Sequence, residues 1–213
     1  MKIIFIGAGN LATNLAHELH SKGHPILQVY SRTEESAKVL SESVGAEAIT
    51  NIGQIETGAD LYLFSVKDSS LEGLLAQMPA TSGLWLHTAG SIPLNIFDKF
   101  HGDYGVIYPF QTFSKSRKVD FSEIPVFVEA NSEKNLEALL HFVETFSRKA
   151  ITLSSEKRKY IHLCGVFACN FVNHLYAVAG NILASEGIPF DVLLPLIDET
   201  ARKVHELSPE KAQ

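Results

Sequence analysis

The first turn of the chain constrains the fold more than any other feature of the sequence. A continuous apolar run from Ile3 to Ile6 leads into Gly7-Ala8-Gly9-Asn10-Leu11-Ala12, and a helical pattern follows. In a turn of this spacing the first glycine permits a tight turn, the second admits a pyrophosphate, and a small third residue lets the helix approach the strand. The start of that helix then faces the phosphates with free N–H groups. The pattern predicts a dinucleotide-binding turn formed by Gly7, Gly9, Asn10, Leu11 and Ala12, with an ordinary strand–helix turn as the alternative.

The end of the second predicted strand indicates which dinucleotide is bound. It carries Tyr30-Ser31-Arg32-Thr33 and has no acidic residue before Glu34. An NAD site usually places Asp or Glu here to accept bonds from the ribose, whereas Arg pairs with a 2′-phosphate. Ser31, Arg32 and Thr33 therefore predict NADP as the cofactor. The alternative is a solvated Arg32 beside Thr33 acting only as a helix N-cap.

Two later loops are expected at the same edge of the sheet. Ser65-Val66-Lys67-Asp68 follows a central strand, and His87-Thr88-Ala89-Gly90-Ser91 follows the next one. Ligands of open α/β sheets lie at the carboxyl ends of the strands. We therefore expect cofactor contacts from Ser65, Val66, Lys67, His87 and Thr88. For His87 the alternative is a side chain held by backbone groups.

Short β-type runs alternate with helical patterns over residues 1–153. This alternation is typical of βαβ units, which build a mostly parallel sheet. The predicted strands are residues 3–6, 26–30, 61–64, 84–86, 105–108, 125–128 and 151–153. The predicted helices are residues 10–22, 33–44, 68–77 and 132–147, with glycines after the first two and Ser132 as the N-cap of the last. The expected fold class is α/β: a Rossmann-type, mostly parallel sheet followed by an all-α C-terminal domain.

The pattern changes at residue 154. Residues 154–186 contain no Pro and only two Gly, which predicts one long helix, and a second helix is expected from about Asp191 to Leu207 after Gly187-Ile188-Pro189. We therefore predict an NADP-binding domain over residues 1–153. Residues 154–213 would form a helical domain for substrate binding and dimerisation.

The long helix has two contrasting sides at about 100° per residue. An apolar seam is formed by Cys164, Ala168, Phe171, Leu175, Val178 and Ile182. It predicts packing against a second subunit in a homodimer, with packing against the NADP-binding domain as the alternative. Polar residues gather on the other side: Lys159, His162, Asn170, Asn173, His174 and Asn181. We interpret His162 as a general acid, with Asn170 and Asn173 orienting the group that gains charge. The alternative is a hydrogen-bond network that fixes packing.

Composition excludes several classes of protein. The chain has 213 residues, 46% of them hydrophobic, and a formal net charge of −6, which disfavours nucleic acid or an anionic membrane as the main partner. Cys164 and Cys169 lie on different faces of one helix, so we expect buried thiols and a cytoplasmic protein. The apolar run at the N-terminus is too short for a signal peptide, and no uninterrupted apolar stretch predicts a membrane span. The grouped His17, His20 and His24 lack the partners of a metal site.

Taken in order, five motifs resemble one known family. They are Gly7 to Ala12, Ser31-Arg32-Thr33, His87 to Ser91, the Tyr108-Pro109-Phe110-Gln111-Thr112-Phe113-Ser114 run, and residues His162 to Phe171. The family comprises Rossmann-like oxidoreductase-related proteins whose C-terminal half is a domain of unknown function. It is similar to pyrroline-5-carboxylate reductases, deazaflavin-linked NADP oxidoreductases and β-hydroxyacid dehydrogenases. The family often has His at the position of Tyr108, and its members usually continue beyond Gln213, so a truncated C-terminus is expected.

The resemblance implies a reductase or dehydrogenase. We expect an NADP(H)-dependent oxidoreductase that acts on a small polar substrate such as an imine, oxo acid or hydroxy acid, with the hydride carried by the cofactor. The pocket could also be lined by Tyr108, Gln111 and Thr112. Two other hypotheses are a non-catalytic NADP(H)-binding sensor, which needs no protonatable group near the acceptor, and a deazaflavin-linked hydride exchanger.

Overall fold

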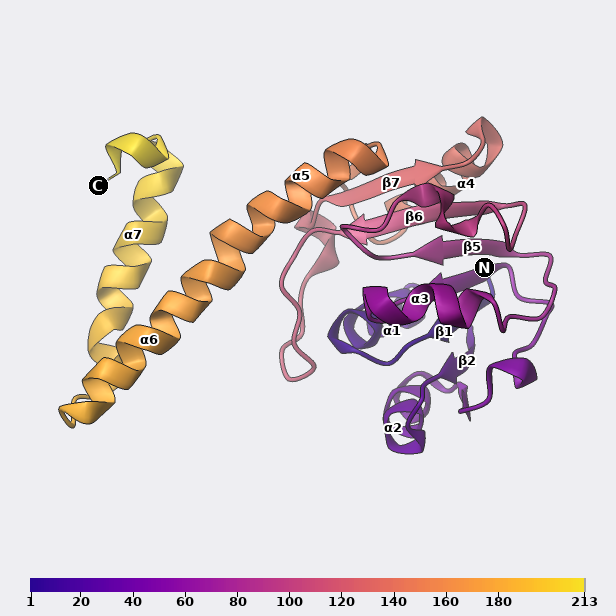
Figure 1. Ribbon diagram of the computed structural model, residues 1–213, viewed down its shortest axis with the longest axis horizontal. Coiled ribbons are helices and arrows are strands. Elements are labelled where there is room, and N and C mark those ends of the chain that lie inside the picture. The colour runs from indigo at the N-terminus through magenta and orange to yellow at the C-terminus, as the bar shows by residue number, and fades with distance from the viewer. Residues whose placement is uncertain (213) are drawn as a thin grey trace. The chain divides into compact units, whose positions relative to one another are not determined.

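The computed structural model describes residues 1–212 and contains an eight-stranded sheet in the order β3-β2-β1-β4-β5-β6-β7-β8 (Figure 1). All neighbouring strands are parallel except β6 and β7, which are antiparallel. The strands are β1 (Ile3–Ile6), β2 (Ile26–Tyr30), β3 (Glu47–Ile49), β4 (Leu61–Phe64), β5 (Leu84–His87), β6 (Tyr104–Pro109), β7 (Val126–Ala130) and β8 (Ala150–Thr152). The chain separates into two compact units, Met1–Leu163 and Cys164–Gln213. The predicted fold class is confirmed.

Alternating side chains of the central strands enter two separate hydrophobic layers. Ile3 and Phe5 of β1 face one layer, and Ile4 and Ile6 face the other, and all four are fully buried. A strand that is covered on both faces must be apolar at every position, which accounts for the uninterrupted run in the sequence.

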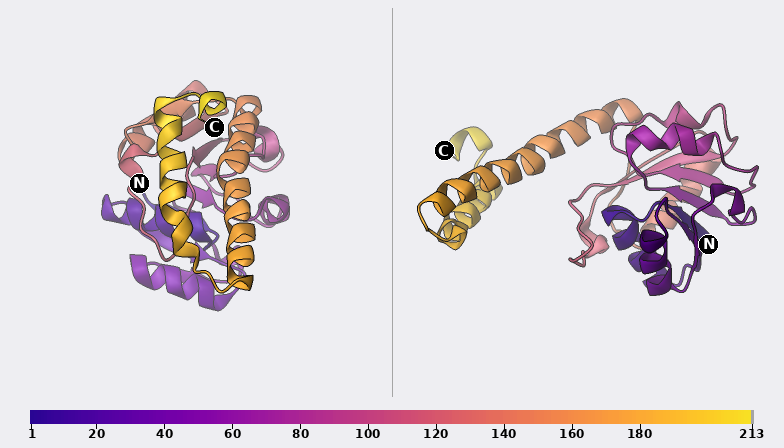
Figure 2. Two further views of the ribbon diagram at one scale, coloured as in Figure 1. Left: turned by 90° about the vertical axis from the view of Figure 1, so that its left-hand side faces the viewer. Right: turned by 60° about the horizontal axis from the view of Figure 1, so that its bottom comes forward.

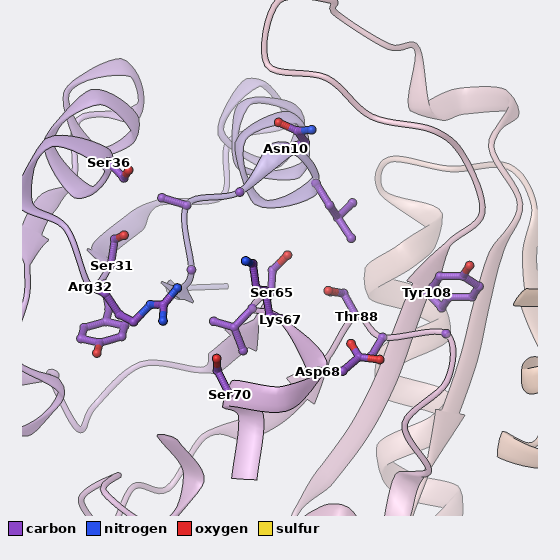
Figure 3. Close-up of a pocket in the computed structure, with 18 of the residues that line it drawn as sticks. Asn10, Ser31, Arg32, Ser36, Ser65, Lys67, Asp68, Ser70, Thr88 and Tyr108 are labelled. Carbon is purple, nitrogen blue, oxygen red and sulfur yellow. The ribbon is translucent and has the colours of Figure 1, made fainter. Parts of the chain in front are cut away.

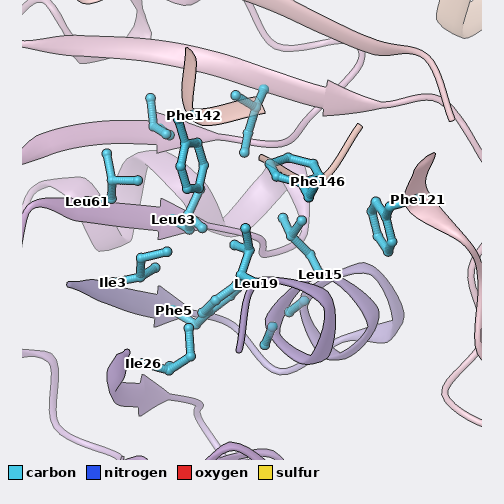
Figure 4. Close-up of a cluster of buried hydrophobic side chains, with 14 of the residues drawn as sticks. Ile3, Phe5, Leu15, Leu19, Ile26, Leu61, Leu63, Phe121, Phe142 and Phe146 are labelled. Carbon is cyan, nitrogen blue, oxygen red and sulfur yellow. The ribbon is translucent and has the colours of Figure 1, made fainter. Parts of the chain in front are cut away.

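Helices close both faces of the sheet. The first layer is covered by α1 (Asn10–Ser21), α2 (Glu34–Val44) and α4 (Glu133–Glu144), and Leu15, Leu19 and Phe142 pack onto the strands there (Figure 4). The second layer is covered by α3 (Asp68–Leu75) together with Phe97. Both faces of the central strands are thus covered, so the loops at the strand ends are where polar side chains can gather.

Helix ends agree with the expected capping residues. Gly23 and Gly45 follow α1 and α2 with φ values of 81° and 67°, in the left-handed region that glycine adopts readily. The Ser132 hydroxyl accepts a bond from the Asn135 N–H at the start of α4. The short strand β3 was not predicted, because it has only three residues, begins with an exposed glutamate and lies at the sheet edge.

The long C-terminal helix begins in the first unit and continues into the second. It comprises α5 (Ser155–Gly165), a π-helical segment (Val166–Phe171) and α6 (Val172–Ser185). The compact units divide inside this helix, because the first turns of α5 are bonded to the sheet unit through Arg158. A π turn holds more residues than an α turn. The uniform angle that groups His162 with Asn170 and Asn173 therefore does not apply across the π segment, and the single polar stripe is interrupted there.

In the second unit α6 is followed by a turn and by α7 (Leu194–Glu206), which runs back from that turn (Figure 2). No described residue of this unit is buried. Cys164 and Cys169 are exposed free thiols, contrary to the expected burial, because the described residues of this unit form no buried core. By length and composition the helix Ser155–Ser185 could cross a membrane, with a mean hydropathy of 1.3 in its most apolar window, a property that core helices of other proteins share.

Candidate functional site

A pocket of about 620 Å³ lies at the carboxyl ends of the parallel strands, where a ligand is expected in this architecture (Figure 3). Every lining residue belongs to the first unit. The walls are the turn after β1, the turn after β2 with Ser36 of α2, the loop from Ser65 to Ser70, the loop from Thr88 to Gly90, Tyr108 of β6 and His162 of α5. A volume of this size is typical of a small-molecule or cofactor site.

Two glycines of the first turn have different physical roles. Gly7 has φ +119°, and a Cβ there would lie 2.1 Å from the Ser65 carbonyl oxygen, so the turn requires glycine. Gly9 lies just before α1, and a Cβ on it would meet nothing within 4 Å. The chain itself therefore does not require glycine at position 9, whereas a phosphate approaching the helix start would.

The turn after β2 carries one cation and several hydroxyls. Ser31, Arg32, Thr33 and Ser36 line the pocket, and no carboxylate lines this end of it. The nearest acid in the sequence, Glu34, is paired with Lys38 at 2.7 Å, and this partner lowers the pKa of Glu34. Thr33 precedes α2 without making a side-chain cap bond. This donor set fits the ribose phosphate of NADP.

The middle of the pocket is formed by the loop after β4. Ser65, Val66 and Lys67 line it as expected, and Asp68 and Ser70 of α3 add to it. The Asp68 carboxylate accepts a hydrogen bond from Ser91, which joins this loop to the one after β5. The lining residues Ser36 and Ser70 were not predicted. Both lie within one helical turn of a predicted binding loop, and that position is the only signal that could have indicated them.

Tyr108 and His162 meet at the far wall of the pocket. The Tyr108 hydroxyl lies 2.9 Å from Nδ1 of His162, although the two residues are 54 positions apart. His162 also packs on Gly90, because a Cβ on that glycine would lie 2.5 Å from the same nitrogen. Burial raises the pKa of Tyr108; nearby Arg158 lowers it and Asp68 raises it further. The pair therefore presents a phenol and an imidazole that share one hydrogen bond at the pocket surface.

Two residues expected at the cofactor do not line the pocket. His87 is fully buried, its ring stacks with Phe97, and its Nδ1 accepts a bond from the Ala89 N–H, which matches the alternative of a side chain held by backbone groups. Burial and the charge of Arg158 lower the pKa of His87 to about 3. Ala12 is also fully buried, since its methyl group packs in the core beneath the turn.

The remaining candidates lie elsewhere. Asn170 and Asn173 belong to the second unit and are exposed there. Gln111 and Thr112 are likewise absent from the pocket wall, and the Gln111 side chain accepts a bond from the Thr112 N–H. Within the part of the chain described, no group of three or more metal-ligating side chains converges.

Comparison with known proteins agrees with this geometry. Residues 2–85 match the family model described as NADP oxidoreductase coenzyme F420-dependent, and residues 124–213 match a domain of unknown function, DUF2520. No curated protein matches the sequence. A Bacteroides fragilis protein, provisionally assigned as an NADP oxidoreductase, is 51% identical, with a TM-score of 0.94 over 100% of this chain and 83% of its own.

More distant structures share the fold. A reductive aminase from Aspergillus terreus, solved with NADPH and ethyl levulinate, is 16% identical, with a TM-score of 0.75 over 96% of this chain and 73% of its own. A 1-pyrroline-5-carboxylate reductase from Streptococcus pyogenes is 17% identical, with a TM-score of 0.71 over 99% of this chain and 82% of its own. Fold and site together define a Rossmann-type nucleotide-binding protein. The chain belongs to the family of NADP oxidoreductase-related proteins that carry the DUF2520 region at the C-terminus.

Proposed function

We propose that this protein is an NADP(H)-dependent oxidoreductase that transfers a hydride to or from a small polar substrate such as an imine, oxo acid or hydroxy acid. The observation that carries the proposal is a single pocket that joins the glycine turn, the acid-free Arg32 turn and the Tyr108–His162 pair. The identity to the Bacteroides fragilis protein supports it. The distant aminase and reductases support the fold alone.

The first turn and the Arg32 turn would hold the two ends of the nucleotide half of NADP. Backbone N–H groups at the start of α1 would bind the pyrophosphate, and the positive end of the helix dipole would stabilise its charge. Arg32 would pair with the additional phosphate, with hydroxyl donors from Ser31 and Thr33. When bound, the cofactor supplies the hydride.

The Tyr108–His162 pair would handle the proton. Hydride addition to a C=N or C=O group leaves negative charge on nitrogen or oxygen, and a protonated group within hydrogen-bond reach stabilises it. The Tyr108 hydroxyl can donate to Nδ1 of His162, which leaves the Nε2 proton of the imidazole available for the substrate. Asn170 and Asn173 remain candidates for orienting the substrate.

Calorimetric titration with NADPH and NADH tests the cofactor assignment. Arg32→Ala should weaken NADPH binding by about 10- to 100-fold, because one charge-assisted contact contributes roughly 1.5–3 kcal/mol. NADH binding should be unchanged. The matched control is Arg148→Ala, which removes an arginine whose side chain is 80% exposed. Equal loss for both nucleotides, or no loss with Arg32→Ala, would contradict the assignment.

Turnover separates an enzyme from a nucleotide sensor. NADPH oxidation should be followed with imines and oxo acids, and NADP reduction with hydroxy acids. With a substrate that the unaltered protein converts, His162→Gln should lose turnover and keep its affinity for NADPH. Tight NADPH binding without turnover across all three classes would favour the sensor.

We further infer that the protein is a cytoplasmic homodimer that forms through the second unit. Phe167, Phe171, Leu175 and Ile182 are each more than half exposed on one helix. Apolar side chains in such a row favour burial against another helix. A second copy supplies an equivalent helix, and the polar Asn170, Asn173 and Asn181 on that helix disfavour a lipid environment. Light scattering of the purified chain should give twice the monomer mass, and a monomer at high concentration would refute the inference.

A further inference from the structure

An ion pair between a buried arginine and a partly exposed glutamate lies behind the pocket wall. Arg158 of α5 is only 1% exposed, and its guanidinium donates to the Glu129 carboxylate at 2.5 Å. The same carboxylate accepts bonds from the backbone N–H and the hydroxyl of Ser155, at 2.8 and 2.6 Å. Glu129 thus binds the first turn of α5 at three points.

The same group of residues also holds the loop after β5. Arg158 donates a second bond to the Ile92 carbonyl oxygen at 2.6 Å, and the Ser155 hydroxyl accepts one from the Leu94 N–H at 2.8 Å. Three segments distant in sequence therefore meet here: the end of β7, the start of α5, and the loop that carries Thr88 to Gly90 into the pocket. We refer to Glu129, Ser155 and Arg158 as the clamp.

The clamp lies one helical turn from His162. Residues four positions apart share a helix face, so Arg158 and His162 project to the same side of α5. His162 reaches Tyr108 and packs against Gly90, and Gly90 belongs to the loop that Arg158 holds at Ile92. Both sides of the His162 contact, the helix and the loop, are thus fixed by the same guanidinium.

We propose that Glu129 and Arg158 are positioning residues, which hold α5 and the loop after β5 so that His162 bonds to Tyr108 at the pocket wall. The functional meaning of that contact rests on the proposed oxidoreductase. An ion pair with a buried arginine contributes little to stability by its charge alone, because desolvation of the arginine offsets much of the Coulomb gain. The ion pair does fix the position of α5 relative to the loop after β5, since the guanidinium of α5 donates directed bonds to the end of β7 and to that loop. The guanidinium charge also lowers the pKa of Tyr108, against the effect of burial.

The test compares clamp variants that keep the fold. Glu129→Gln combined with Arg158→Met removes both charges together, so that no unpaired charge is buried. Arg158→Lys keeps the charge but not the fork. The control pair is Glu123→Gln with Arg148→Met, which removes an exposed ion pair with 3.6 Å between charged atoms. Circular dichroism establishes that each variant is folded.

The readout is the nitrogen chemical shifts of the His162 ring, assigned with His162→Gln and measured by two-dimensional NMR. In the unaltered protein the Nδ1 shift should show a hydrogen bond that Tyr108→Phe abolishes. The folded double variant should give the same shift as Tyr108→Phe, Arg158→Lys an intermediate one, and the control pair no change. A folded double variant with the unaltered His162 shift would overturn the proposal.

A substitute variant and the NADPH affinity of each variant complete the test. If the double variant does not fold, Glu129→Asp keeps both charges and shortens one arm of the clamp, and the same shift criterion then decides. NADPH affinity should fall less in every clamp variant than in Arg32→Ala, because Arg158 and Ser155 bond Ile92 and Leu94 of the loop after β5 and not the glycine turn or the Arg32 turn. Failure of the unaltered protein to bind NADPH would refute the proposed function, while the NMR comparison would still decide the role of the clamp.

Discussion

The two units of this chain solve the burial of apolar surface in opposite ways. In the sheet unit, β1 and β4 bury every residue, and helices from the same chain cover both faces. In the second unit no described residue is buried, although the long helix that enters it is apolar, with a mean hydropathy of 1.3 in its most apolar window. The difference shows that apolar patterning states how much surface must be covered but not which molecule covers it. The lining residues of the pocket all lie in the sheet unit, whereas the apolar helix of the second unit has no buried residue of its own.

Truncation of one phenylalanine in each unit should give the largest contrast. Phe5 is fully buried between strands, so Phe5→Ala should lower the free energy of unfolding by about 3–5 kcal/mol. Phe171 is 53% exposed, so Phe171→Ala should change the free energy of unfolding by less than about 0.5 kcal/mol in a dilute monomer. Urea unfolding followed by circular dichroism measures both.

Protein concentration sharpens this comparison. If a second copy covers Phe171, the effect of Phe171→Ala should grow as protein concentration rises, because a partner that binds only the folded chain stabilises it by mass action. The effect of Phe5→Ala relative to the unaltered protein should be the same at every concentration. A concentration-independent loss of several kcal/mol in Phe171→Ala would show that the helix is already covered within one chain.

The glycines of the first turn separate folding from binding inside the sheet unit. Gly7→Ala should destabilise the fold by about 2–4 kcal/mol, because its φ of +119° disfavours a side chain and the new Cβ would overlap the Ser65 carbonyl. Gly9→Ala should leave stability nearly unchanged, since that Cβ meets nothing. It should nevertheless weaken NADPH binding at least about tenfold by occupying the approach to the pyrophosphate. Thermal unfolding and calorimetry on the same samples distinguish the two, and tight NADPH binding by Gly9→Ala would place the pyrophosphate elsewhere.

Sequence reasoning was correct for features that depend only on residues close together in the sequence. The run from Ile3 to Ile6, the glycines after α1 and α2, and the Ser132 cap each depend on nearby residues, and each was placed correctly. The fold class follows from such local signals, because alternating strands and helices admit few arrangements.

The features that sequence reasoning missed depend on contacts between distant segments. The hydrogen bond between Tyr108 and His162 joins positions 54 apart, and the sequence near each residue does not predict it. His87 is buried and stacks on Phe97, a contact ten positions away that decides between the two interpretations of this residue. The π segment after Gly165 shifts the faces of the long helix, and periodicity at a constant angle cannot detect it. Side-chain contacts between distant segments and departures from ideal helix geometry are thus the two sources of error.

The smallest expected effect concerns the pH dependence of the sheet unit. In the unfolded chain His87 binds a proton near its ordinary pKa of 6.5, whereas burial keeps it neutral in the folded chain down to about pH 3. Between these values the unfolded state holds the extra proton, so stability should fall with acidification by up to about 1.4 kcal/mol per pH unit. His17 and His24 also have lowered pKa values, so the comparison must be made against His87→Asn, whose side-chain oxygen can still accept the Ala89 N–H bond. The unfolding free energy of the unaltered protein should fall more steeply between about pH 7 and pH 5 than that of His87→Asn. Equal slopes would mean that His87 takes up its proton without leaving the folded state, and the sheet unit would then be less tightly closed around β5 than its burial indicates.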